Sequence, residues 1–133
     1  VDFVVHFHGH NSAAKDVIGG QKLSDQQEVL TYLSDICSDV YAAESGLLRA
    51  KASLATQQPR ASLHVDAARV FVNDAMARVE TNTKQALAAM TQGDTLRTML
   101  AATRRLFKWT PIDTVTLRRR LADEAAARKG YPL

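Results

Sequence analysis

The fold is decided by residues 24–55, which read SDQQEVLTYLSDICSDVYAAESGLLRAKASLA. Apolar side chains recur in this stretch at steps of three and four residues, the spacing that places them along one face of an α-helix. Ser24 followed by Gln27 is typical of a helix start, and Pro59 stops the pattern. We therefore predict one long helix with a single inward stripe, which comprises Val29, Leu30, Leu33, Ile36, Cys37, Val40, Tyr41, Leu47, Leu48 and Leu54.

A second long helix is predicted over residues 60–91, where apolar residues again recur at helical spacing. Its expected inward residues are Leu63, Val70, Phe71, Ala75, Met76, Val79, Ala86, Leu87 and Met90. We expect Gly93 to cap the C-terminal end of this helix and Asp94 to cap the start of the next one. Such a short connection makes consecutive helices turn back on one another.

Two shorter helices complete the pattern. The third is predicted over residues 95–107 and ends before Pro111, because proline disfavours helix in the residue that precedes it. Asp113 is expected to cap the fourth helix, which Gly130 ends. Two long and two short helices with short connections predict an all-α fold, an antiparallel four-helix bundle over residues 22–133.

The first 21 residues differ in character from the rest of the chain. Residues 3–8 are rich in β-branched and aromatic side chains and are followed by turn-forming residues, so we predict a short extended segment ahead of the bundle. The predicted domain organisation is therefore an extended leader over residues 1–21 and a helical bundle over residues 22–133.

Three histidines alternate within this leader, so a strand would place His6, His8 and His10 on one face. Three imidazoles on one face are candidate ligands for a metal such as Zn²⁺. No carboxylate or cysteine joins them locally, and a fourth ligand would have to come from the helices. We therefore predict no metal site and keep the three histidines as the candidates.

The leader also carries a resemblance of its own. Residues 4–11, VVHFHGHN, resemble the strand and His-Gly turn of α/β-hydrolases, whose loop helps to form the oxyanion hole. Enzymes of that family need a G-x-S-x-G nucleophile elbow, and no such motif follows the turn in this sequence. The leader is thus interpreted as a foreign segment or a hydrolase-like fragment, and a hydrolase fragment is kept as an alternative function.

The net charge of +3 is unevenly distributed. Residues 94–133 hold nine Arg and Lys residues against four Asp and Glu residues, and the rest of the chain has no basic excess. One interpretation is a binding surface for phosphate, an anionic lipid headgroup or nucleic acid. The interpretation that we favour is a solvated face that pairs with acidic residues of neighbouring helices. Nucleic acid is not expected, because Trp109 alone is interleaved among the basic residues. The basic patch comprises Arg104, Arg105, Lys108, Arg118, Arg119 and Arg120.

No catalytic residue is predicted. Glu44 and Glu80 lie on predicted helices, and a carboxylate inside a bundle can act as a base, but glutamate is mostly a solvated residue. Cys37 is the only cysteine and falls on the apolar stripe, so we interpret it as a buried packing residue rather than a nucleophile.

Several short stretches of the helical part carry a family resemblance. They are QQEVL at residues 26–30, LSDI at 33–36, VYAAES at 40–45 and GDTLRTML at 93–100. From about residue 24 to residue 133, the chain resembles the C-terminal helical domain of acyl-CoA dehydrogenases of the long-chain and very-long-chain type. The motifs occur in the right order along the whole of this region.

The resemblance implies a fatty acid β-oxidation oxidoreductase that uses FAD and a catalytic glutamate. Both belong to a core upstream of the matching region, so no cofactor-binding or catalytic residue is expected here, and whether the chain is itself an enzyme is left open. The implied role is that of a non-catalytic domain for assembly or membrane docking. The expected partners are the missing core or a second subunit, as in a homo-oligomer, and an anionic membrane surface. The expected location is cytoplasmic, with peripheral membrane association as an extension. A helical bundle that binds anions or nucleic acid is the remaining alternative.

Overall fold

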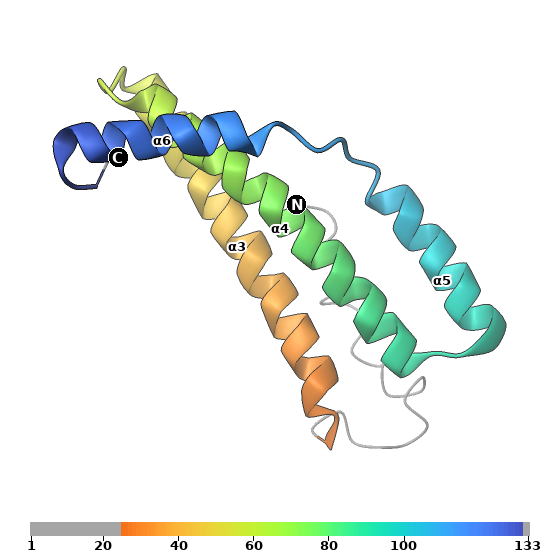
Figure 1. Cartoon of the computed structure of the whole chain (residues 1–133). Helices are drawn as coiled ribbons and strands as arrows, with labels where there is room; N and C mark the ends of the chain where they lie inside the picture. The colour runs from red at the N-terminus through yellow and green to blue at the C-terminus, as the bar shows by residue number, and fades with distance from the viewer. Residues whose placement is uncertain (1–24, 132–133) are drawn as a thin grey trace. The chain divides into compact units, whose positions relative to one another are not determined.

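The computed structural model describes residues 25–131, and these residues form four α-helices and no strand. The helices are α3 (Gln27–Ala55), α4 (Ala61–Met90), α5 (Gly93–Leu106) and α6 (Thr114–Arg128), as Figure 1 shows. Their bounds lie within a few residues of those predicted, and the all-α class is confirmed. The single antiparallel bundle stays a prediction. The extended segment predicted at residues 3–8 lies outside the described residues.

The helices contribute to two compact units. The first unit holds the described residues up to Val40 together with Arg78–Lys108, so it contains the first half of α3, the second half of α4 and α5. The second unit holds Tyr41–Ala77 and the residues from Trp109 onward, so it contains the second half of α3, the first half of α4 and α6.

Small residues dominate the core of the second unit. Its buried apolar residues are Ala50, Ala61, Leu63, Ala68 and Ala75, and four of these five are alanines. The α4 alanines follow one another at seven-residue steps, the repeat of a helix–helix seam. In the first unit the buried apolar residues are larger and are Val29, Ile36, Val79 and Ala86.

The predicted inward stripe of α3 is wrong in the second unit, and in the first unit Leu30 is also exposed. Tyr41, Leu47, Leu48 and Leu54 are all exposed in the second unit, with Tyr41 74% and Leu48 59% accessible, and we call these four residues the outer face of α3. Alanine and serine face inward instead, since Ala50 and Ser53 are buried. Small side chains let two helix backbones approach closely. The contact between the helices therefore contains Ala50 and Ser53, and the larger residues face outward. Cys37 is also exposed, so its assignment as a buried packing residue is wrong.

The end of α3 is a Schellman motif built without glycine. The Gln58 N–H donates to the Ser53 carbonyl at 3.0 Å and the Gln57 N–H donates to the Leu54 carbonyl at 3.1 Å. Gln57 adopts the left-handed conformation with φ of 50°. The Ser53 hydroxyl also donates to Oε1 of Gln58 at 3.2 Å. The two backbone bonds satisfy carbonyls that the last turn of a helix leaves open.

Gln57→Gly should raise the free energy of unfolding by about 1 kcal/mol, because a residue with a Cβ is strained in the left-handed region and glycine is not. Urea denaturation followed by circular dichroism measures the change. Gln57→Ala is the matched control, since it removes the same side chain but keeps the Cβ. An equal gain from both variants would refute the argument from backbone strain.

Three predicted caps, at Gly93, Asp94 and Gly130, differ from those observed. Gly93 has φ of 56° and begins α5, and Gln92 occupies the N-cap position, so Asp94 lies in the first turn and pairs with Arg97 at 3.1 Å. At the end of α6, Lys129 rather than Gly130 takes the left-handed position, with φ of 53°. At the start of α5 and at the end of α6, the backbone geometry and its hydrogen bonds determine which residue occupies the cap position.

Candidate functional site

The contact between α4 and α6 in the second unit is centred on a buried carboxylate. The side chain of Asp66 is 8% exposed, and its Oδ2 accepts a hydrogen bond from Nη1 of Arg120 at 2.6 Å. The second guanidinium nitrogen, Nη2, donates to the hydroxyl of Ser62 at 3.0 Å. A buried charge is tolerated where a charge-assisted hydrogen bond compensates its lost hydration, and Arg120 supplies that bond.

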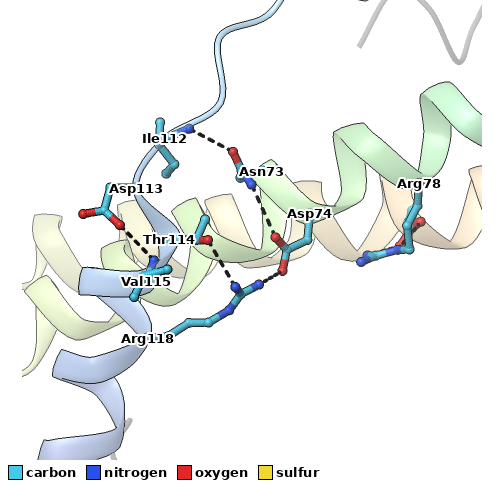
Figure 2. Close-up of polar contacts among 9 residues, drawn as sticks. Asn73, Asp74, Arg78, Ile112, Asp113, Thr114, Val115 and Arg118 are labelled. Carbon is cyan, nitrogen blue, oxygen red and sulfur yellow. Dashed lines mark hydrogen bonds and ion pairs between the residues drawn. The ribbon is translucent and has the colours of Figure 1, made fainter.

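A second polar cluster lies two turns further along α4 (Figure 2). Asp74 pairs with Arg118, which also donates to the Thr114 hydroxyl at 3.1 Å. The neighbouring Asn73 accepts a hydrogen bond from the backbone N–H of Ile112 at 3.0 Å, so α4 also holds the segment that leads into α6. No residue of α6 is fully buried, and these polar contacts link the helix to α4.

Asp113 is the N-cap of α6, as the sequence predicted. Its Oδ1 accepts from the N–H groups of Val115 at 3.0 Å and Thr116 at 3.1 Å, and its Oδ2 accepts from the Thr116 hydroxyl at 2.6 Å. The hydrogen bond from the Thr116 hydroxyl, followed by that from the Thr116 N–H, holds the pKa of Asp113 below its ordinary value. The ionised cap therefore stabilises the first turn of α6.

The lowered pKa of Asp113 predicts a loss of α6 stability in acid. Because the folded-state pKa lies below the unfolded one, the stabilisation is fully present above the unfolded pKa and is lost as pH falls through the folded pKa. The protection factors of the Val115 and Thr116 amides against hydrogen exchange should therefore fall in that range. Asp113→Asn caps a helix without titrating, so its amides should not show this acid-induced step. The same step in both proteins would assign it to another group.

The first unit has its own inter-helix ion pair. Arg78 on α4 binds Asp39 on α3 through two nitrogens, with Nη2–Oδ1 at 2.6 Å and Nε–Oδ2 at 2.9 Å. Glu80, one of the two weighed carboxylates, pairs with Lys84 at 2.6 Å. The Arg78–Asp39 pair links α4 to α3, and the Lys84–Glu80 pair lies within α4. A carboxylate that is paired with a cation is a poor candidate for a general base.

Comparison with known proteins decides the family. The family model of the acyl-CoA dehydrogenase C-terminal domain matches residues 12–105 of this chain. The chain belongs to the acyl-CoA dehydrogenase family. A probable acyl-CoA dehydrogenase of Bacillus subtilis (strain 168) is 38% identical over 104 residues, which are 77% of this chain and 18% of that protein. The crystal structure of a Bacillus anthracis acyl-CoA dehydrogenase complexed with FAD is 30% identical, with a TM-score of 0.83.

The structural match covers 90% of this chain and 20% of the Bacillus anthracis chain. This acyl-CoA dehydrogenase domain therefore spans about a fifth of the length of its relatives. The matched region starts at residue 12, inside the segment assigned to the leader, and ends at residue 105, within α5. These matches favour the acyl-CoA dehydrogenase interpretation over a hydrolase fragment or an anion-binding bundle.

The structure divides the predicted basic patch between the two units. Arg104 and Arg105 lie in the last turn of α5, Lys108 follows them, and all three are exposed in the first unit. Arg118, Arg119 and Arg120 lie on α6 in the second unit. Arg118 and Arg120 bind α4 carboxylates, which is the kind of pairing that we favoured. A binding role for the six residues remains the alternative interpretation.

The other predicted site residues are placed as follows. His6, His8 and His10 lie outside the described residues. Residues 25–131 contain no cluster of three or more His, Cys, Asp or Glu side chains that fits a metal ion. None of the helices in these residues combines the length and hydropathy of a membrane-spanning segment.

One surface hollow of the described part lies along α6, and its residues do not suit a flavin, because one helix cannot enclose a planar ring system. Its lining residues are Thr116, Arg119, Arg120, Asp123, Glu124 and Ala127. Four of these six carry a charge, whereas cofactor pockets are mostly apolar.

Sequence reasoning missed two features that the structure assembles. It did not single out Asp66 and Asp74, although their eight-residue spacing matches two turns of α4 and Arg118 and Arg120 were already in view. It also merged the outer face of α3 into one inward stripe. Residue size is the signal that distinguishes the inward face of α3 from its outer face, because Ala50 and Ser53 alternate with leucines along the helix.

Proposed function

We propose that this chain is a non-catalytic helical domain of an FAD-dependent acyl-CoA dehydrogenase of fatty acid β-oxidation, and that it acts in the assembly of that enzyme. The exposure of large apolar side chains carries the proposal. Ten large apolar residues of the described part are at least 36% exposed, whereas five of its nine buried apolar residues are alanines. Large exposed apolar patches mark interaction surfaces.

Catalysis is assigned to the rest of the enzyme in this proposal. The relatives hold about four fifths of their length outside the matched region, and the hollow along α6 is lined mostly by charged residues, which do not suit a flavin. The partner is therefore the catalytic portion of an acyl-CoA dehydrogenase, in the same subunit or a second one. A cytoplasmic location goes with this proposal.

The assembly role is tested in a fusion. This chain replaces the matching segment of the Bacillus subtilis relative, and the fusion is compared with the same catalytic portion alone. We expect the fusion to form one assembled species in gel filtration and to melt several degrees higher, since an added interface stabilises the folded state. An equal number of subunits, melting temperature and acyl-CoA oxidation rate in the two proteins would overturn the assembly role.

The chain alone should carry no flavin. The prediction rests on the hollow along α6, whose mostly charged lining does not match the apolar isoalloxazine ring. The absorbance spectrum of the purified chain, after incubation with FAD and gel filtration, measures the retained cofactor. The intact fusion is the positive control, and flavin retained by the chain alone at a one-to-one ratio would contradict the prediction.

A further inference from the structure

The outer face of α3 carries two charges among its large apolar residues. At about 100° per residue, Glu44 and Lys51 project between the Tyr41–Leu48 line and the Leu47–Leu54 line of the helix. Both are exposed, and in the described part of the chain neither has an ion pair or a side-chain hydrogen bond. Positions 40, 41, 47 and 48 around Glu44, and 47, 48, 54 and 55 around Lys51, offer no side chain of opposite charge on α3.

We propose that the outer face of α3 binds the same face of a second copy of this chain, with the two helices antiparallel. The arrangement of the charges is the argument. Glu44 and Lys51 are equally distant from the midpoint between Leu47 and Leu48. An antiparallel pairing about this midpoint places each Glu44 opposite Lys51 of the second copy. A parallel pairing would oppose Glu44 to Glu44 and Lys51 to Lys51, which is repulsive.

A two-fold pairing of this kind uses one surface twice, as isologous interfaces do. The leucines at the centre and Tyr41 and Leu54 at the ends leave water on both copies, which drives the association. The two Glu44–Lys51 pairs select the direction and the register of the helices. The inference rests on the proposed assembly role, and it leaves Met99 and Leu106 on α5 exposed for the catalytic portion.

Sedimentation equilibrium of the 133-residue chain tests the pairing. One helix face buries less area than a standard protein interface, so we expect a dissociation constant of roughly micromolar size. Leu48→Asp should abolish the dimer. Leu106→Asp is the matched control, because Leu106 on α5 is 64% exposed against 59% for Leu48, and it should leave the constant unchanged. Circular dichroism verifies that each variant keeps its helical content.

Charge reversal tests the register. Glu44→Lys and Lys51→Glu should each weaken the dimer by about tenfold, since each creates two like-charge contacts. The double variant Glu44→Lys with Lys51→Glu restores opposite charges and should recover the wild-type constant to within about threefold. A surface that packed on another part of the chain or on another partner would show no such recovery.

A monomeric wild-type chain overturns the proposal, as does a dimer that Leu106→Asp disrupts and Leu48→Asp does not. Failure of the double variant to recover overturns the antiparallel register. The fusion separates this failure from that of the assembly role. If the catalytic portion without the domain fails to assemble while the chain alone stays monomeric, that result supports the assembly role and contradicts the α3 pairing.

Discussion

Leu63→Ala should lower the free energy of unfolding of this chain by about 3 kcal/mol, because deleting a buried leucine loses its transfer free energy and leaves a cavity. Leu63 is 6% exposed on α4 and is the one large residue among the buried apolar residues of the second unit. The surrounding alanines have little freedom to fill the space. Urea denaturation, with a protein concentration low enough to exclude dimers, measures the loss.

Leu48→Ala is the control for this prediction. The substitution is chemically the same, but Leu48 is 59% exposed on the outer face of α3. The expected change is within about 0.5 kcal/mol, as for most surface substitutions. Comparable losses at the two positions would mean that Leu48 is buried in the isolated chain and that the outer face has been wrongly assigned.

Asp66→Ala should lower the free energy of unfolding by about 2 kcal/mol, since a hydrogen bond to a charged group is worth more than one between neutral groups. Asp66 is nearly buried, and its substitution leaves Arg120 with Ser62 as its remaining bonded partner on α4. Amide exchange in α6 should accelerate in parallel, because the ion pair is one of the contacts that hold this helix. Denaturation and hydrogen exchange measure the two effects.

Asp74→Ala provides the matched comparison. Asp74 also pairs with an α6 arginine, but its side chain is 31% exposed and Arg118 is 52% exposed. Exposed pairs are typically worth less than about 1 kcal/mol, so this variant should lose the smaller amount. A double-mutant cycle of Asp66→Ala with Arg120→Ala isolates the pair itself. Equal losses from Asp66→Ala and Asp74→Ala would show that burial does not set the strength of these contacts.

The placement of the helices was predictable because its causes are local. Apolar spacing, the carboxylate of Asp113 before α6 and Pro59 after α3 act within one or two turns of the chain, so they can be read in order along it. The family was also predictable, because its motifs are short stretches of consecutive residues. The exact cap residues were less predictable. Gln57 and Lys129 adopt the left-handed conformation that glycine usually adopts, and only the folded backbone shows this.

The sequence alone determined the helices, their bounds to within a few residues, the all-α class and the family of this domain. The tertiary structure alone decided which side of α3 faces the core, and therefore that Tyr41, Leu48 and Cys37 are exposed. Periodicity marks apolar positions on a helix but not their partner, and in the second unit the close packing of alanines chose the small residues. The pairing of Asp66 with Arg120, 54 positions apart, likewise depends on how α4 and α6 meet.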